Sequence, residues 1–143
     1  MNKFLDLLNE RRDDYKTWVP VYSSAIREYV FFNMVGFNHL RFKPNNTPRD
    51  PKVAMYKLGL LPLVRPAIHK ATSVSQYKRM LGPIGGSRKV VLKEFEYWGL
   101  VAVIGKRNTK VKVVLRRAVN GDRLHFWSVM KLGENQKAPE GAF

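Results

Sequence analysis

The chain has 143 residues, no cysteine and a formal net charge of +15, with 26 basic residues against 11 acidic ones. This length predicts one domain, and the lack of cysteine excludes disulfide frameworks, thiolate zinc sites and cysteine nucleophiles. No apolar run is long enough to span a bilayer, and the amino-terminal segment lacks the apolar core of a signal peptide. We therefore expect no membrane partner and a cytoplasmic location, or delivery into a target cytoplasm.

The positive charge is unevenly distributed. Twenty of the 26 basic residues lie between Arg41 and Lys131, a span with only four acids, and aromatic residues are interleaved with them. A surface that mixes cations with aromatic rings is typical of nucleic-acid binding. A membrane-surface protein would instead carry a long basic amphipathic helix, which the sequence lacks.

The first part of the chain has helical spacing of apolar residues. Residues 3–16 predict one helix, and a second is predicted from Val21 to Met34, with Gly36 just beyond its end. Residues 1–35 are therefore interpreted as an N-terminal helical region.

The middle of the chain predicts further short helices. An acidic N-cap followed by proline begins one of them at Asp50-Pro51. Another is predicted over 62–70, and a third, capped by a serine, ends at Met80. Residues 82–89 are rich in glycine and predict a loop.

From about Val90 onward the composition becomes strand-like. Residues 97–104 predict one strand, and residues 111–131 predict a hairpin around Asn120-Gly121, a dipeptide that favours a two-residue type I′ turn. Together these segments predict three or four antiparallel strands.

The candidate functional surface is predicted to lie on one face of this hairpin. A two-residue loop pairs Arg116 with His125 and Val114 with Trp127, and alternation places all four on one face. Ser128 falls on the opposite, apolar face unless a β-bulge shifts the strand. The face that mixes cation, imidazole and indole is interpreted as the functional one.

These elements predict an α+β fold, with N-terminal helices packed on one face of a C-terminal antiparallel sheet of three to four strands. The chain is divided into the helical region 1–35, a core over 36–132 and a polar tail over 133–143, within a single domain.

Three stretches carry a resemblance to a known family. They are GFNHLRF (36–42), LLPLVRPAI (60–68) and YWGLVAVIG followed by the hairpin sequence (97–131). In this order they resemble the phage-associated and small-genome-bacterial members of the barnase–EndoU–colicin–RelE superfamily of metal-independent ribonucleases. The resemblance implies an RNase-toxin-like fold with its active site on the sheet, and no cofactor or metal.

Carried over to matching positions, the family pattern implies four catalytic residues: His39, Arg116, His125 and Ser128. Arg117 could be the matching arginine instead. The sequence departs from the wider superfamily because it has no carboxylate near these positions, so a glutamate base is not expected.

The residues themselves fit metal-independent RNA cleavage. Such cleavage needs proton transfer at the 2′- and 5′-oxygens and cations that neutralise the phosphorane. A guanidinium beside His125 favours the neutral imidazole, which suits a base, and His39 would be the second proton-transfer group. His69, at a helix end, is interpreted as structural.

Several cations and one indole are candidate RNA contacts: Arg41, Lys43, Lys106, Lys112, Arg117 and Trp127. A surface lysine is more often simply solvated, and a strand tryptophan more often belongs to the core. The expected partners are RNA and an acidic antitoxin or immunity protein that restrains the enzyme. The alternative function is a non-catalytic RNA-binding or ribosome-associated module.

Overall fold

The computed structural model describes residues 2–43, 47–83, 92–121 and 123–133, and their strands form one mixed six-stranded sheet. The strand order is β1-β2-β6-β5-β4-β3. In chain order the elements are α1 (Lys3–Tyr15), β1 (Val21–Ser23), β2 (Glu28–Phe31), α2 (Met34–His39), α3 (Pro51–Leu60), the 3-10 helix η1 (Leu61–Leu63), α4 (Val64–Lys70), β3 (Val74–Pro83), β4 (Leu92–Ile104), β5 (Thr109–Ala118) and β6 (Leu124–Lys131).

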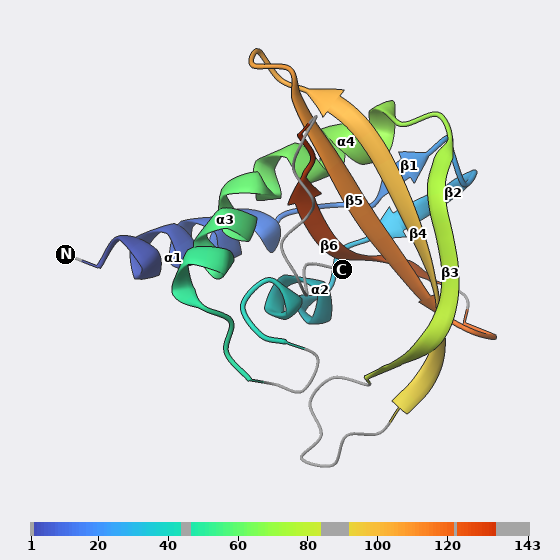
Figure 1. Ribbon diagram of the computed structural model, residues 1–143, viewed down its shortest axis with the longest axis horizontal. Coiled ribbons are helices and arrows are strands. Elements are labelled where there is room, and N and C mark those ends of the chain that lie inside the picture. The colour runs from blue at the N-terminus through green and yellow to red at the C-terminus, as the bar shows by residue number, and fades with distance from the viewer. Residues whose placement is uncertain (1, 44–46, 84–91, 122, 134–143) are drawn as a thin grey trace.

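The helices are arranged on one side of this sheet. Helix α4 packs on β4 and β5, α1 packs on α3, and α2 lies beside β6 (Figure 1). The fold is therefore α+β, as predicted, but the sheet has more strands than the three or four expected and is not purely antiparallel.

The helix predicted from Val21 to Met34 is wrong. This segment forms the hairpin β1–β2, in which Val21 pairs with Val30. Val30 is fully buried whereas Tyr29 is 58% exposed, so the burial alternates with the period of a strand. The expected helical region 1–35 thus contains a helix, a strand hairpin and the start of α2.

Strand β2 also joins the N-terminal half to the end of the chain. It runs parallel to β6, with Val30 opposite Leu124 and Phe31 opposite His125. This pairing makes the sheet mixed, and it brings the residues that follow β2 next to His125.

The helix predicted to end at Met80 is also wrong. Residues 74–83 form the edge strand β3, in which Lys78 pairs with Tyr97 and Met80 with Phe95. The tertiary pairing with β4 overrides the local preference here. Of the loop predicted over 82–89, residues 82 and 83 belong to β3 and the rest lie outside the described residues, as do residues 134–143 of the polar tail.

The other two helices predicted in the middle of the chain, from Asp50-Pro51 and over 62–70, are confirmed. Asp50 caps α3, because its side chain accepts a hydrogen bond from the Lys52 N–H, and Pro51 occupies the first turn. The helix continues through Gly59 to Leu60, and η1 connects it to α4.

The β5–β6 hairpin has the predicted pairing of Arg116 with His125. The connection between the two strands is longer than the predicted two-residue turn, because β5 ends at Ala118 and β6 begins at Leu124. Asn120 has the positive φ expected of it, 69°. The N–H of Gly121 donates to the Ala118 carbonyl, 2.7 Å away.

A β-bulge changes the register further along this hairpin. Leu115 pairs with Phe126, but Val114 pairs with Ser128, which leaves Trp127 as the extra residue. The predicted pairing of Val114 with Trp127 is therefore wrong. Such a bulge shifts the side-chain alternation by one, and it moves Val129 into the core beneath the helices.

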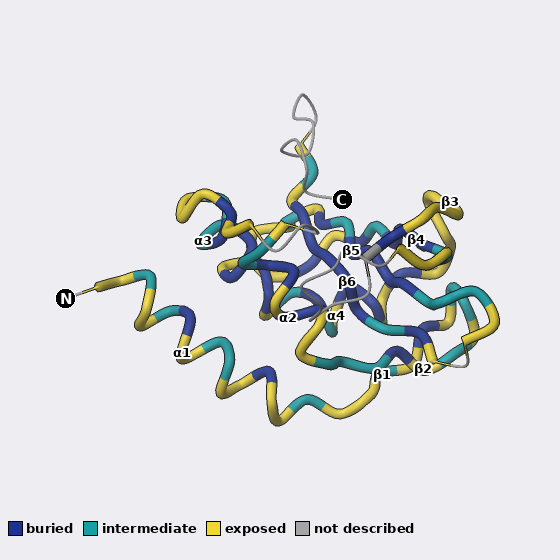
Figure 2. Tube along the Cα trace, turned by 90° about the horizontal axis from the view of Figure 1, so that it is seen from below, coloured by how far each residue is buried: buried dark blue, intermediate teal, exposed yellow. Residues whose placement is uncertain are grey.

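Two apolar clusters result, one on each face of the sheet. The larger lies between sheet and helices, and the smaller contains Phe95, Tyr97, Val114, Trp127 and Met130. Buried positions gather along β5 and β6, whereas they alternate with exposed ones along α1 (Figure 2). We call the face that carries the smaller cluster the far face, because it lies away from α4. None of the helices described here is long and apolar enough to cross a membrane.

Candidate functional site

The two faces of the sheet differ in charge. In the register of β3, β4 and β5, five cations lie on the far face: Lys78, Lys93, Lys110, Lys112 and Arg116. Glu94 and Glu96 alternate to the other face, where Arg79 contacts Glu94 at 2.5 Å. Among the described residues of these three strands, the far face therefore carries cations and no acid.

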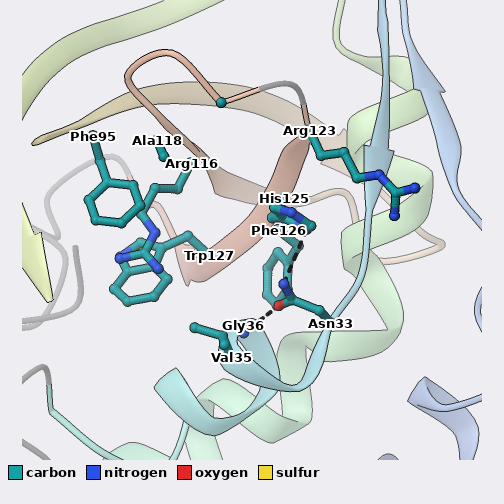
Figure 3. Close-up of a pocket in the computed structure, with 11 residues that line it drawn as sticks. Asn33, Val35, Gly36, Phe95, Arg116, Ala118, Arg123, His125, Phe126 and Trp127 are labelled. Carbon is teal, nitrogen blue, oxygen red and sulfur yellow. Dashed lines mark hydrogen bonds between the residues drawn. The ribbon is translucent and has the colours of Figure 1, made fainter. Parts of the chain in front are cut away.

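A cavity of about 270 Å³ opens at the end of this face nearest the β5–β6 connection (Figure 3). Its polar side chains are Asn33, Arg116, Arg123 and His125. The rest of its described lining is made by Val35, Gly36, Phe95, Ala118, Gly121, Phe126 and Trp127. The site thus combines the Arg116 guanidinium, an imidazole and an amide with apolar walls, whereas the Arg123 guanidinium is directed away from it (Figure 3).

Arg116 is held between two aromatic rings. Its guanidinium carbon lies 3.9 Å from the Phe95 ring centroid and 3.6 Å from that of Trp127, as Figure 3 shows. Stacking on both faces fixes the plane of the guanidinium while leaving its N–H groups at the edge for hydrogen bonds. Burial lowers the pKa of Arg116, and a hydrogen bond with Tyr97 raises it. Since arginine starts from a very high pKa, the group stays charged.

His125 lies directly opposite Arg116 on the neighbouring strand and is half-buried. Its Nδ1 is 3.2 Å from Nδ2 of Asn33. The Asn33 Oδ1 in turn accepts a hydrogen bond from the Gly36 N–H at the start of α2. The imidazole and the guanidinium therefore line one cavity from adjacent strands, in the relation that the sequence predicts.

Trp127 is not a platform for a nucleotide base. It is 5% exposed, and the His39 ring stacks on it at 3.8 Å with an interplanar angle of 16°. With Arg116 over the ring as well, both faces of the indole are covered. The predicted role of Trp127 in stacking on a base is therefore corrected. The indole instead packs between His39 and Arg116 and holds the Arg116 guanidinium in place.

His39 lies behind Trp127 and does not line the cavity. It is 5% exposed, and its Nε2 is 3.3 Å from Nη2 of Arg49. A guanidinium only donates, so this Nε2 accepts and the ring is held neutral. The structure therefore gives His39 a supporting position instead of the predicted one at the reacting phosphate.

Ser128 is likewise buried, with no exposed surface, and does not line the cavity. Its Oγ is 2.9 Å from Nζ of Lys57, which also donates to the Val129 carbonyl. Burial, with a smaller effect of nearby Arg49, lowers the pKa of Lys57 to about 7. The Ser128 hydroxyl therefore accepts a hydrogen bond that joins β6 to α3, a structural role in place of the predicted catalytic one.

Strand alternation separates the two adjacent arginines, Arg116 and Arg117. Arg117 lies on the opposite face from Arg116, where it pairs with Glu28 at 2.7 Å. It also covers the Trp98 ring. Arg116 is the one that lines the cavity.

The other predicted RNA contacts are dispersed. Lys112 is on the far face, where it donates to Gln76, and burial, followed by the charge of Lys78, lowers its pKa. Lys106 lies in the exposed β4–β5 turn, Lys43 is exposed after α2, and the Arg41 guanidinium lies 5.0 Å over the Phe42 ring. Of these, only Lys112 shares a face with the cavity.

Asn33, Arg123 and Phe95 are cavity residues that sequence reasoning does not identify. Asn33 is hidden by the helix prediction, because its place beside His125 depends on the parallel pairing of β2 with β6. The carbon of the Arg123 guanidinium lies 4.8 Å from the centroid of the Phe31 ring. Because Phe31 belongs to β2, this contact also depends on the pairing of β2 with β6.

Neither a metal centre nor a relative identifies this site. Among the described residues, no group of three or more histidine, cysteine, aspartate or glutamate side chains could hold a metal ion. Comparisons with protein families, with curated proteins and with solved structures find no match to this chain.

Proposed function

We propose that this protein is a metal-independent endoribonuclease with an RNase-toxin-like fold, related to the barnase–EndoU–colicin–RelE superfamily that its sequence resembles. The observation that carries the proposal is the pairing of Arg116 with His125 across β5 and β6 in one cavity. A stacked guanidinium and an imidazole that line one cavity are suited to a phosphodiester, which needs charge neutralisation and hydrogen bonds at once.

The charge of the sheet supports RNA as the substrate. Among the described residues of β3, β4 and β5, five cations lie on the far face, and the whole chain carries +15. Such a surface attracts a polyanion over a distance and concentrates it near the cavity.

The proposed reaction is an internal transphosphorylation. The 2′-oxygen attacks the neighbouring phosphorus, a P–O2′ bond forms and the P–O5′ bond breaks. The 2′-hydroxyl gives its proton to water, and the departing 5′-oxygen takes a proton from water. Arg116 neutralises the charge on the phosphorane, and His125 hydrogen-bonds a phosphorane oxygen. The products carry a 2′,3′-cyclic phosphate and a 5′-hydroxyl.

An acidic antitoxin or immunity protein is the partner that we propose as a restraint. A surface of aspartate and glutamate laid over the far face would pair with its cations and close the cavity at the same time. The site of action would be the cytoplasm, of the host or of a target cell.

The second candidate is a non-catalytic RNA-binding module. The burial of His39 and Ser128 favours it, because it leaves His125 as the one histidine among the described residues that line the cavity. Both functions predict salt-sensitive RNA binding, so turnover must separate them.

The deciding experiment is an incubation of labelled tRNA and mRNA with the protein in EDTA, followed by analysis of the fragment ends. We expect cyclic phosphate and 5′-hydroxyl ends, and a loss of about 10²-fold in rate for His125→Ala. His69→Ala, at an exposed histidine of α4, is the matched control and should cleave as wild type. Binding without fragments at any pH, unchanged by His125→Ala, would support the binding module instead.

A further inference from the structure

The orientation of the Asn33 amide is set by its surroundings. Asn33 lies between β2 and α2, where its Oδ1 accepts from the Gly36 N–H at 3.2 Å. Its main-chain carbonyl accepts from the Tyr15 hydroxyl at 2.6 Å. With the amide oxygen committed to the N–H of Gly36, the NH2 group is the part that faces Nδ1 of His125.

This contact determines where His125 carries its proton. An amide NH2 only donates, so Nδ1 must accept, and the proton of the neutral ring then lies on Nε2. We propose that Asn33 is a positioning residue that holds His125 as the Nε2–H tautomer, so that His125 donates a hydrogen bond to a phosphate oxygen and does not act as the general base. The catalytic half of this inference rests on the proposed ribonuclease function.

The described cation that shares the cavity acts in the same direction. An imidazolium would carry a proton on Nδ1, directed at the Asn33 NH2, and would share the cavity with the Arg116 guanidinium. Both contacts oppose a further positive charge. A neutral imidazole that donates to a developing oxyanion has a known precedent among enzymes.

The first test is nitrogen NMR of the histidine rings in the full-length protein, labelled with 15N, between pH 5.5 and 8.5. Loss of one set of signals in His125→Ala assigns the ring. We expect Nδ1 of His125 unprotonated and Nε2 protonated at pH 7. A proton on Nδ1, in either the other tautomer or the imidazolium, would overturn the inference. The result needs no turnover, so it stands apart from the test of ribonuclease activity.

Two variants separate the hydrogen bond to His125 from the cap of α2. Serine and aspartate both preserve an N-cap acceptor for the Gly36 N–H. Asn33→Ser is too short to reach the ring, whereas Asn33→Asp offers Nδ1 an acceptor in place of a donor. We expect aspartate to move the proton to Nδ1 and to keep the imidazolium to higher pH, and serine to leave the tautomer mixed.

The kinetic expectation follows from the same change. For an active wild type, Asn33→Ser should lower kcat by about threefold to tenfold, the equivalent of one net hydrogen bond, with little change in KM. In Asn33→Asp the imidazolium still donates from Nε2, but the neutral ring keeps its proton on Nδ1 and loses that donor. Asn33→Asp should therefore give cleavage a falling limb at high pH that the wild type lacks. Ring spectra and pH profiles of Asn33→Asp that match the wild type would show that Asn33 only caps the helix.

Discussion

At the scale of single residues, the site depends on side chains whose shape matters as much as their charge. Arg116 is 8% exposed and lies between two rings, and Trp127 lies between Arg116 and His39. A planar cation is required at this place, because only a flat group fills the space between two aromatic faces.

Replacing Arg116 by lysine tests this dependence on shape. The ammonium keeps the charge but cannot stack on either ring, so we expect a loss of about 1–2 kcal/mol in the free energy of unfolding. RNA cleavage should fall by about 10²-fold. Arg79→Lys, at an exposed arginine of β3, is the control and should change neither quantity appreciably. Urea denaturation and the cleavage assay measure both.

Lys57 makes a second prediction at this scale. Its pKa is lowered from 10.5 to about 7 by burial, with a further contribution from Arg49. The unfolded chain therefore binds a proton between pH 7 and 10.5 that the folded protein does not, so stability rises with pH in this window and is lowest below it. We expect a slope of up to about 1.4 kcal/mol per pH unit from this group.

Denaturation of the wild type and Lys57→Met at several pH values between 7.0 and 9.5 measures this slope. The Lys57→Met slope should be smaller by the contribution of Lys57. Lys52→Met, at an exposed lysine of the same helix, should retain the wild-type slope. Equal slopes in all three proteins would contradict the burial of a neutral Lys57.

At the scale of elements, the outer edge of β6 is covered by two kinds of partner. Strand β2 pairs with its first two residues. Beyond them, Gly36 of α2 approaches the Phe126 carbonyl, and Lys57 and Tyr56 of α3 bind the main chain of Val129 and Lys131. Covering the edge in this way prevents pairing with another strand, and it also sets the position of α2 and hence of Asn33.

Gly36→Ala should disturb this arrangement. A Cβ at residue 36 would collide with the main-chain oxygen of Phe126, which cannot rotate away. We expect a loss of about 1–3 kcal/mol in the free energy of unfolding, together with weaker cleavage, because α2 and Asn33 must shift.

Gly59→Ala is the matched control. It lies within helix α3, and a Cβ there has nothing within 4 Å. Alanine should stabilise the protein by about 0.5–1 kcal/mol, since it loses less backbone entropy than glycine. Thermal denaturation should move the two variants in opposite directions; a shift of the same sign would argue against the close approach of α2 to β6.

At the scale of the whole molecule, charge is separated between the two faces of the sheet. Lys78, Lys93 and Lys110 lie on the far face with Arg116, whereas Glu28, Glu94 and Glu96 lie on the other. On the other face Arg79 and Arg117 pair with acids, so the unbalanced cations of these strands favour the far face for RNA.

The double variant Lys78→Ala/Lys110→Ala tests this direction. It lowers the net charge from +15 to +13, and so does Lys16→Ala/Lys52→Ala, whose lysines are exposed at the end of α1 and on α3. The far-face variant should reduce the slope of log affinity against log salt by about 0.7 for each RNA phosphate that it no longer neutralises. The control should keep the wild-type slope; equal effects in a filter-binding titration would mean that only the net charge matters.

The sequence by itself determined the features that depend on neighbouring residues. Asp50-Pro51 marks a helix start because the cap and the N–H that it accepts from lie within one turn. The pairing of Arg116 with His125 follows from the spacing around Asn120, and the two-residue alternation predicts that they share a face.

Only the tertiary structure decided the features that depend on distant pairing. Residues 21–34 satisfy a helical spacing, but β1 pairs with β2, and β2 pairs with β6, about ninety residues away. The gain from the sheet outweighs local propensity. The bulge at Trp127, the burial of His39 and Ser128, and the contact of Asn33 with His125 all arise where α2 and α3 meet β6. Local sequence carries no signal for such contacts, because their energy comes from groups that meet only after the chain has folded.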